Sequence, residues 1–173
     1  EFRRVLFRSF DRQMRRRDLV DVLGHTAVDA AIVVSLPVSD HEVAGLLDRG
    51  IGLSLLGTRH PLASTVSIDD AHAAATLTAH FADYGHRRIG LVSSAPFAPT
   101  PDDVARSRRS GYLRALSQAG LTPDPGLEAQ ADFSIRGAQR AFEQLFSRAN
   151  PPTAIVAEND ELAFGVLTAA RAH

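Results

Sequence analysis

The 173-residue chain contains no cysteine, no lysine and no tryptophan. Without cysteine, a disulfide framework and any thiolate metal site are excluded, and a reducing compartment is compatible with the composition. No apolar run approaches the ~20 residues that span a bilayer, so we expect no membrane partner. Because GC-rich codon usage favours arginine over lysine without any functional cause, we attribute the missing lysine to genome composition.

The chain also lacks a strong net charge, which is -1 at pH 7. A nucleic-acid-binding domain is expected to carry a basic face, so we predict that this stretch does not bind DNA by itself. One basic run, at residues 12–17, precedes apolar residues of a predicted helix that ends near Gly24. Aspartates at positions 11, 18 and 21 interrupt this run, and we interpret it as a solvated helix face.

The first nine residues, 1–9, look foreign to a natural protein. Their back-translated codons match a common sequencing-adapter oligonucleotide, so we expect a non-native artefact and a native polypeptide that starts near Phe10. The other end, at residues 171–173, stops inside a helical pattern without a glycine or proline stop signal. We therefore expect a fragment that is cut at both ends.

Short apolar runs alternate with amphipathic segments along the rest of the chain. Residues 30–36 form a continuous apolar run before Pro37, which predicts a strand buried on both faces inside a parallel sheet. Ser39 and Glu42 have the spacing of a capping box, and Gly50 ends the helix that follows. Further strands are predicted at 51–56, 65–68, 88–93, 128–133 and 153–157, and further helices at 70–84, 103–119, 134–147 and from 160. This alternation predicts an α/β fold of doubly wound parallel sheets.

Ligands of such folds bind beyond the carboxyl ends of the strands, here residues 93–102, 133–134 and 158–160. The chain has no G-x-G-x-x-G opening a helix, no nucleophile elbow and no Walker loop. Its histidines show no recognised ligand spacing. We expect no catalytic residue, no cofactor and no metal, and an α/β enzyme has no positive support, although fold alone does not exclude it.

Three signatures occur in a fixed order: Gly85–Gly90 (G-H-R-R-I-G), Arg108 with Gly111-Tyr112, and Asn159-Asp160 with Ala163 and Gly165. Weaker matches accompany them at residues 28–32, 66–70, 80–81, 132–137 and 153–155. Together they resemble the LacI/GalR family of bacterial transcriptional regulators. The resemblance implies a periplasmic-binding-protein-like fold of two subdomains around an effector cleft. Residues 10–87 would be part of the N-terminal subdomain and residues 88–173 part of the C-terminal subdomain.

The same resemblance suggests four ligand-binding residues. Arg108 aligns with a family arginine and suits sugar hydroxyls or an anionic group, the alternative being an exposed helix arginine like its neighbours. Phe133 aligns with an aromatic that stacks on a sugar or base, and an ordinary core phenylalanine is an equal alternative. Asn159 aligns with a residue that hydrogen-bonds the effector. Asp160 belongs to the same set, although we interpret it first as the N-cap of the helix that follows.

Two further positions have structural interpretations. At least one of Asp69 and Asp70 is expected to cap a helix. His86 is expected to make a structural hydrogen bond at the subdomain junction rather than to act in catalysis.

The resemblance implies the effector-sensing domain of a cytoplasmic, LacI-type repressor that binds a sugar or nucleoside-like molecule. The full-length protein would be a homodimer that binds operator DNA only through an N-terminal helix-turn-helix absent from this sequence. A periplasmic sugar-binding protein of an ABC-type transporter is the alternative, and the genomic sequence upstream of Phe10 would decide. Because the family's first strand is interior, we also expect the isolated fragment to be marginally stable and prone to stick.

Overall fold

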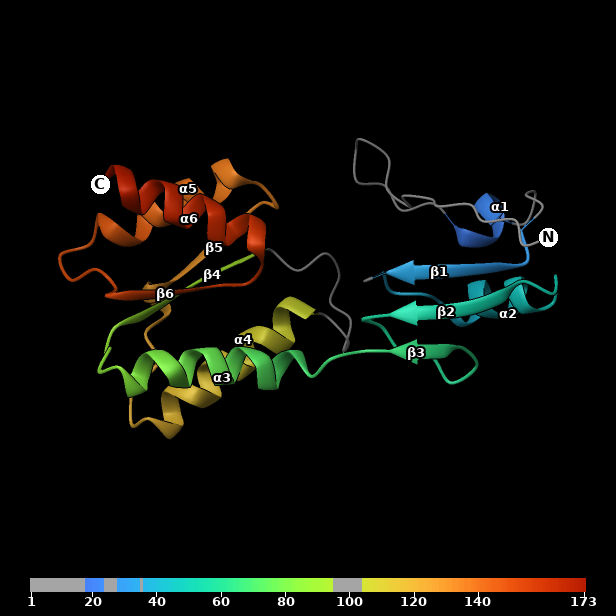
Figure 1. The fold of residues 1–173 in the computed structure, drawn as a ribbon, viewed down its shortest axis with the longest axis horizontal. Helices are drawn as coiled ribbons and strands as arrows, with labels where there is room; N and C mark the ends of the chain where they lie inside the picture. The colour runs from blue at the N-terminus through green and yellow to red at the C-terminus, as the bar shows by residue number, and fades with distance from the viewer. Residues whose placement is uncertain (1–17, 24–27, 35, 95–103) are drawn as a thin grey trace. The chain divides into compact units, whose positions relative to one another are not determined.

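A computed structural model describes residues 18–23, 28–34, 36–94 and 104–173 (Figure 1). Contacts within the chain divide it into two compact units, with the boundary between Ile68 and Asp69. We call them the first unit and the second unit. The suspected artefact at 1–9, the basic run at 12–17 and most of the loop at 93–102 lie outside the described residues.

The first unit contains a parallel sheet of three strands. Its elements are α1 (Leu19–Leu23), β1 (Ala30–Val34), α2 (Asp40–Leu47), β2 (Gly52–Leu56) and β3 (Ser64–Val66). The strand order is β1-β2-β3, and β1 pairs with β2 from Ala30 opposite Gly52 to Val34 opposite Leu56. Each of these elements has the type that the sequence predicts, and the strand ends differ from the predicted ones by one or two residues.

Among the described residues, helices cover only one face of this sheet. Val33, Leu53 and Leu55 are at most 6% exposed and share an apolar core with residues of α1 and α2. Ile32 and Val34, which point to the opposite face, are 67% and 57% exposed. The prediction that this strand is interior and buried on both faces is therefore wrong for β1. Among the described strands β1 lies at the edge of the sheet, and an apolar run is buried on both faces only where a layer packs on each side.

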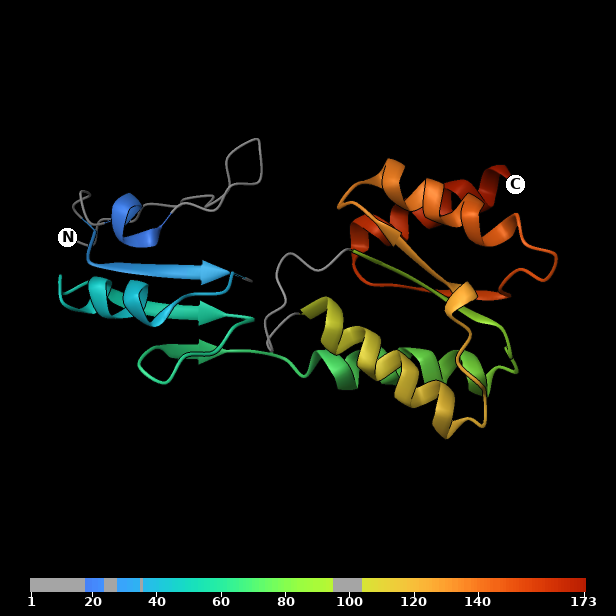
Figure 2. The same ribbon diagram turned by 180° about the vertical axis from the view of Figure 1, so that it is seen from behind.

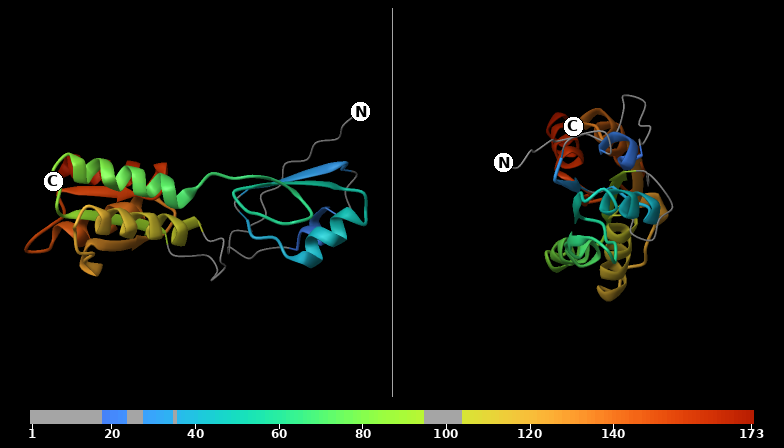
Figure 3. Two further views of the ribbon diagram at one scale, coloured as in Figure 1. Left: turned by 90° about the horizontal axis from the view of Figure 1, so that it is seen from below. Right: turned by 90° about the vertical axis from the view of Figure 1, so that its right-hand side faces the viewer.

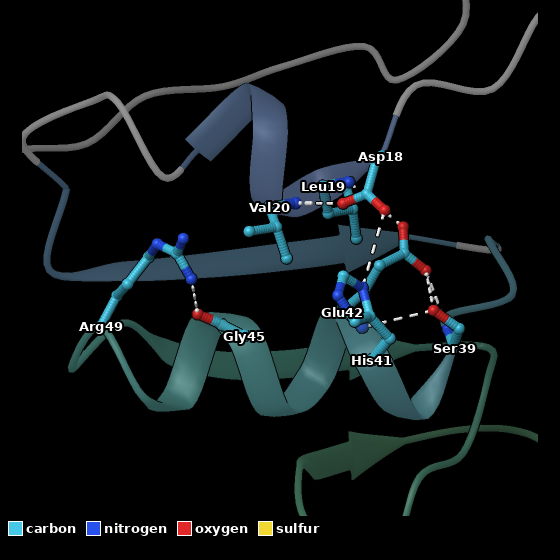
Figure 4. A network of polar contacts seen from close by, with 8 residues as sticks. All are labelled: Asp18, Leu19, Val20, Ser39, His41, Glu42, Gly45 and Arg49. Atoms are coloured by element: carbon cyan, nitrogen blue, oxygen red, sulfur yellow. Dashed lines mark hydrogen bonds and ion pairs between the residues drawn. The ribbon is translucent and has the colours of Figure 1, made fainter.

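Helix α2 begins with the predicted capping box (Figure 4). The Ser39 hydroxyl accepts the backbone N–H of Glu42 at 3.3 Å, and Glu42 Oε2 accepts the backbone N–H of Ser39 at 2.9 Å. Glu42 is only 1% exposed, and its Oε1 accepts the N–H of Leu19 at 3.1 Å. Since a buried carboxylate is costly without partners, these bonds fix α1 against the start of α2.

The second unit contains another three-stranded parallel sheet, with the strand order β5-β4-β6. Helices α3 and α4 cover one of its faces, and α5 and α6 cover the other (Figures 1 and 2). The prediction of a doubly wound α/β fold is confirmed here. The elements are α3 (Asp70–Asp83), β4 (Ile89–Ser94), α4 (Val104–Gln118), a 3₁₀ turn (Pro125–Leu127), β5 (Glu128–Ala131), α5 (Ile135–Phe146), β6 (Ala154–Ala157) and α6 (Asp160–Ala172).

The position of α3 explains why the boundary lies earlier than the predicted one at 87/88. Ala82 of α3 shares an apolar cluster with Leu91 of β4 and Val156 of β6. A boundary after residue 87 would divide this cluster, because α3 would be separated from the sheet that it covers. The helix therefore belongs to the second unit, although it precedes the first strand of that unit.

Two of the signature glycines, Gly111 and Gly165, lie where two helices approach closely. The view from below in Figure 3 shows α3 and α4 side by side. A Cβ atom on Gly111 of α4 would lie 1.9 Å from the backbone oxygen of Ala71 in α3. A Cβ atom on Gly165 of α6 would lie 2.5 Å from both the Cβ of Ala138 and the backbone oxygen of Ile135. Real Cβ atoms essentially never show such distances. These glycines are thus required by packing within the second unit.

Candidate functional site

The predicted site residues of the second unit meet at one edge of its sheet. Phe133 follows β5, and Asn159 and Asp160 follow β6. Since the three strands are parallel, their carboxyl ends lie on the same edge, which is where ligands of such sheets bind. Arg108, on the helix after β4, reaches the same edge through its contact with Glu158.

Arg108 is held by two separate segments. Its Nε donates to Oδ1 of Asp70 at 2.8 Å, and its Nη2 lies 2.8 Å from the same oxygen. Its Nη1 donates to the backbone oxygen of Glu158 at 2.6 Å. The Arg108 side chain is 28% exposed and that of Asp70 is 13% exposed. The guanidinium is therefore oriented and partly screened from water, and still reachable from solvent.

The neighbouring arginines on α4 have other roles. Arg109 donates to the Glu128 carboxylate at the start of β5, including a 2.9 Å bond from Nη2 to Oε1, and this hydrogen bond raises the pKa of Arg109. Arg114 donates to the backbone oxygen of Ala71 at 3.3 Å. Both side chains are on the exposed side of the helix, as predicted. Of these three arginines, Arg108 alone contacts the chain just after β6.

Glu158 links the carboxyl ends of β4 and β6. Its carboxylate accepts the backbone N–H of Ser94, and each of its oxygens lies 2.9 Å from the Ser94 hydroxyl. Ser94 is 3% exposed, so this carboxylate is anchored on the last residue of β4. Sequence reasoning placed Glu158 after a strand and did not choose it as a site residue. The location of Glu158 directly after a strand was the only sequence signal for it, because its bond to Ser94 joins residues far apart in the chain.

Asn159, and not Asp160, is the N-cap of α6. The side-chain oxygen of Asn159 accepts the N–H of Leu162 at 2.9 Å, and Asn159 has the extended backbone of an N-cap. Asp160 is the first helical residue of α6 and is exposed. The prediction of Asp160 as the N-cap is therefore wrong. The chain becomes helical at residue 160, so the cap is the residue before it.

Phe133 lies on a tight turn between β5 and α5. Ser134 caps α5 by accepting the N–H of Gly137 at 2.9 Å, and the Ser134 hydroxyl donates to Asp132 Oδ1 at 2.6 Å. A Cβ on Gly137 would lie 1.8 Å from that same carboxylate oxygen, so a larger residue there would displace the Asp132 side chain. The Phe133 side chain is 44% exposed, which does not fit the core alternative. A stacking role stays a prediction.

The two adjacent aspartates at the start of α3 have different roles. Asp69 is the N-cap and accepts the N–H of His72 at 2.8 Å, as expected for one of the two. Asp70 bonds Arg108 instead, a role that the sequence did not suggest. His86 Nδ1 lies 2.9 Å from the Thr153 hydroxyl and its ring meets Phe81 edge-on, which supports a structural role.

The described ranges contain neither a candidate metal cluster nor a candidate membrane-spanning helix. There, no three histidine, aspartate or glutamate side chains are grouped so that they could hold a metal ion. No helix in the same ranges is both long enough and apolar enough to cross a membrane.

Comparison with known proteins places this arrangement in a family. The family of periplasmic binding protein-like domains matches residues 78–173. The transcriptional repressor CytR of Escherichia coli K12 is 33% identical over 107 residues, 62% of this chain and 30% of the repressor. The transcriptional regulator GalS of Salmonella typhimurium is 29% identical over 163 residues, 93% of this chain and 47% of GalS.

A solved structure shows the same architecture. The transcriptional regulator CelR, in complex with cellobiose, is 28% identical and superimposes with a TM-score of 0.71, covering 89% of this chain and 47% of CelR. The chain spans less than half the length of the curated relatives described above. The superposition with CelR shows that the two chains share a fold over most of the present chain. The chain therefore belongs to the periplasmic binding protein-like domain family, in the form found in LacI/GalR-type regulators.

Proposed function

We propose that this chain is the effector-sensing part of a LacI-type transcriptional regulator and binds a sugar or nucleoside-like molecule at the carboxyl ends of β4, β5 and β6. The observation that carries the proposal is the position of Arg108. Its guanidinium is oriented by Asp70 and by the backbone oxygen of Glu158, the residue before Asn159, at the edge where ligands of parallel sheets bind. CytR and GalS are named as transcriptional regulators, and the CelR structure contains cellobiose.

The side chains at this edge offer complementary chemistry to a hydroxylated ligand. Arg108 donates hydrogen bonds, and the Asn159 amide nitrogen offers further donors because only its oxygen is used by the cap. Asp160 is exposed and accepts. The exposed face of Phe133 suits the flat side of a sugar ring or a base. We propose these four residues as the ligand contacts of the second unit.

In this proposal the chain is a sensor with no catalytic residue and no cofactor. Effector binding shifts a two-state equilibrium, and the shift alters DNA affinity in a part of the protein outside this sequence. We further propose that the complete regulator is a homodimer that acts on operator DNA in the cytoplasm. The assignment of the two units to partial N- and C-terminal subdomains of the effector-binding domain is part of the same proposal. The relatives reported above are regulators, so a periplasmic transport function gains no support from them.

Calorimetric titration of the complete encoded protein with glucose, galactose, cellobiose, cytidine and adenosine tests the sensor. We expect saturable binding of at least one compound. Arg108→Gln should weaken it by about 10- to 100-fold, the usual range for a charged hydrogen bond. Arg109→Gln is the matched control, because this neighbouring arginine pairs with Glu128 instead. Absence of saturable binding across the whole panel would refute the sensor function.

The regulatory half of the proposal has a separate test. The genomic sequence upstream of Phe10 should encode a helix-turn-helix, and the complete protein should retard its own promoter DNA in a gel. The compound that binds in the titration should change that retardation. A secretory signal peptide in the upstream sequence would overturn this assignment in favour of a transport protein.

A further inference from the structure

Arg108 carries a charge that the protein itself already neutralises. Asp70 places one carboxylate oxygen 2.8 Å from both Nε and Nη2 of Arg108. The two side chains are only 13% and 28% exposed, so water screens their attraction less than it would at an open surface. An anionic ligand at Arg108 would therefore meet a cation that is already paired.

The same contacts define which donors remain. A guanidinium has five N–H groups in one plane. Asp70 and the Glu158 backbone oxygen engage three of them within the described residues. Because these partners come from α3 and from the segment after β6, they fix the plane of the guanidinium. The remaining N–H groups can donate to two adjacent hydroxyl oxygens without contributing an unpaired charge.

The other charges at this edge favour a neutral ligand as well. The Glu158 carboxylate is bonded to Ser94, and no cation among the described residues pairs with it. The positive N-terminal end of α6 carries Asp160 and Glu161 in its first turn, and these carboxylates compete with any incoming anion. Arg140 is paired with Asp132 at 3.3 Å. With Arg136 in the first turn of α5 counted, the carboxylates around the carboxyl ends of β5 and β6 (Asp132, Glu158, Asp160 and Glu161) outnumber the guanidiniums (Arg108, Arg136 and Arg140).

We propose that Asp70 is a positioning residue that orients and neutralises Arg108, so that the site takes an uncharged polyhydroxylated ligand in preference to its phosphorylated counterpart. This inference rests on the proposed function for its ligand. It goes beyond it by naming the charge class of that ligand and the residue that sets the preference. A phosphate ester brings nearly two negative charges at neutral pH, and like charges at a binding surface oppose association.

The first test compares matched pairs of ligands on the complete protein. The probes are glucose with glucose 6-phosphate, and cytidine with cytidine 5′-monophosphate. We expect the uncharged member of the pair that binds to bind at least about tenfold more tightly. Asp70→Asn should reduce this ratio, because it leaves the Arg108 charge unpaired. Glu128→Gln, which removes the ion pair of the neighbouring Arg109, should leave the ratio unchanged.

The proposal is overturned if the phosphorylated member binds as tightly as the uncharged one in the unmodified protein. It is also overturned if Asp70→Asn lowers thermal stability while the ratio stays constant, which is the result expected of a purely structural ion pair.

The second test needs no effector. The Arg108 Nε–H resonance, assigned by its loss in Arg108→Gln, should be shifted and protected from solvent exchange in the unmodified protein and should lose both properties in Asp70→Asn. Titration with inorganic phosphate should move this resonance only in the variant. A phosphate response in the unmodified protein, or a resonance that Asp70→Asn does not change, overturns the proposal. If no sugar or nucleoside binds, the sensor function fails while this measurement still decides the role of Asp70.

Discussion

The two sheets of this chain share a construction and differ in how they are covered. Each has three parallel strands. In the second unit, helices pack on both faces, and Leu91 and Val92 of β4 are buried on opposite sides. In the first unit, the described helices pack on one face, and Ile32 and Val66 on the other face are 67% and 69% exposed.

This difference shows that the sequence of a strand sets which faces are apolar, whereas the neighbouring helices decide which faces are buried. Strands β1 and β4 carry apolar residues on both faces, the pattern of parallel sheets that lie between two layers of helices. In the second unit, helices cover both faces of the sheet, and the apolar residues of β4 are part of a packed core on each side. Where the described residues supply one layer, the same pattern leaves an apolar surface of the kind that promotes association. The expectation of a marginally stable and adhesive chain has its structural basis there.

The largest effect is expected from breaking the close packing of the second unit. Gly111→Ala places a methyl group against the Ala71 backbone oxygen, so α3 and α4 must separate. We expect a loss of about 3 kcal/mol in the free energy of unfolding, which exceeds the ~1 kcal/mol that alanine gains from helix propensity. Urea denaturation measures it. Ser110→Ala, on the exposed side of the same helix, is the control and should change stability little.

The comparison itself predicts different local stabilities. Amide hydrogens of β1–β3 should exchange at least about tenfold faster than those of β4–β6, a difference of ~1.4 kcal/mol in opening free energy, because fewer contacts hold the first sheet. Hydrogen exchange followed by mass spectrometry on the chain measures both sheets in one sample. Equal protection of the two sheets would contradict this prediction, because the uncovered face would then not lower the opening free energy of the first unit.

A smaller effect distinguishes capping from ligand binding at the start of α6. Asn159→Ala should cost about 1 kcal/mol of stability, because Leu162 loses its acceptor. Asn159→Asp keeps the capping oxygen and removes the amide donors, so stability should be retained while effector affinity falls. Thermal melts and titrations of both variants provide the measurements. Unchanged affinity in Asn159→Asp would assign Asn159 to capping alone.

The smallest stability change is expected on the uncovered face of the first sheet. Ile32→Thr combined with Val66→Thr should alter the free energy of unfolding by less than about 0.5 kcal/mol, because both side chains are already exposed. Light scattering should show reduced self-association. Val33→Thr, on the covered face of the same strand, is the matched control and should destabilise clearly. A large loss in the double variant would show that other parts of the protein cover this face.

Local patterns predicted most of the fold because their causes act over a few residues. The capping box of Ser39 and Glu42 and the cap at Asp69 depend on bonds between residues three apart, and the sequence displays them directly. The order of strands and helices follows from the spacing of hydrophobic residues, because each helix or strand must place its apolar side chains on the face that is buried. The error at Asn159 and Asp160 has the same origin. Asparagine and aspartate are both favourable N-cap residues, so the sequence alone does not show at which of the two the helix begins.

The candidate site was predictable in place and only partly in detail. Arg108, Phe133 and Asn159 were chosen because they follow strands or match family positions, and their contact with a ligand stays a prediction. The role of Asp70 was not, because its bond to Arg108 joins residues 38 positions apart. Glu158 was missed for a similar reason, since its carboxylate bonds Ser94 across 64 positions.

The sequence by itself determined the fold class, most of the helix caps, the family signatures and the edge of the sheet at which we propose that a ligand binds, because each depends on neighbours close in the chain or on a pattern repeated along it. Only the tertiary structure decided that α3 belongs with the second sheet, that Gly111 and Gly165 are packing glycines, and that Asp70 neutralises Arg108. These features arise where distant segments come within contact distance. Their energies depend on that proximity, which no single segment specifies.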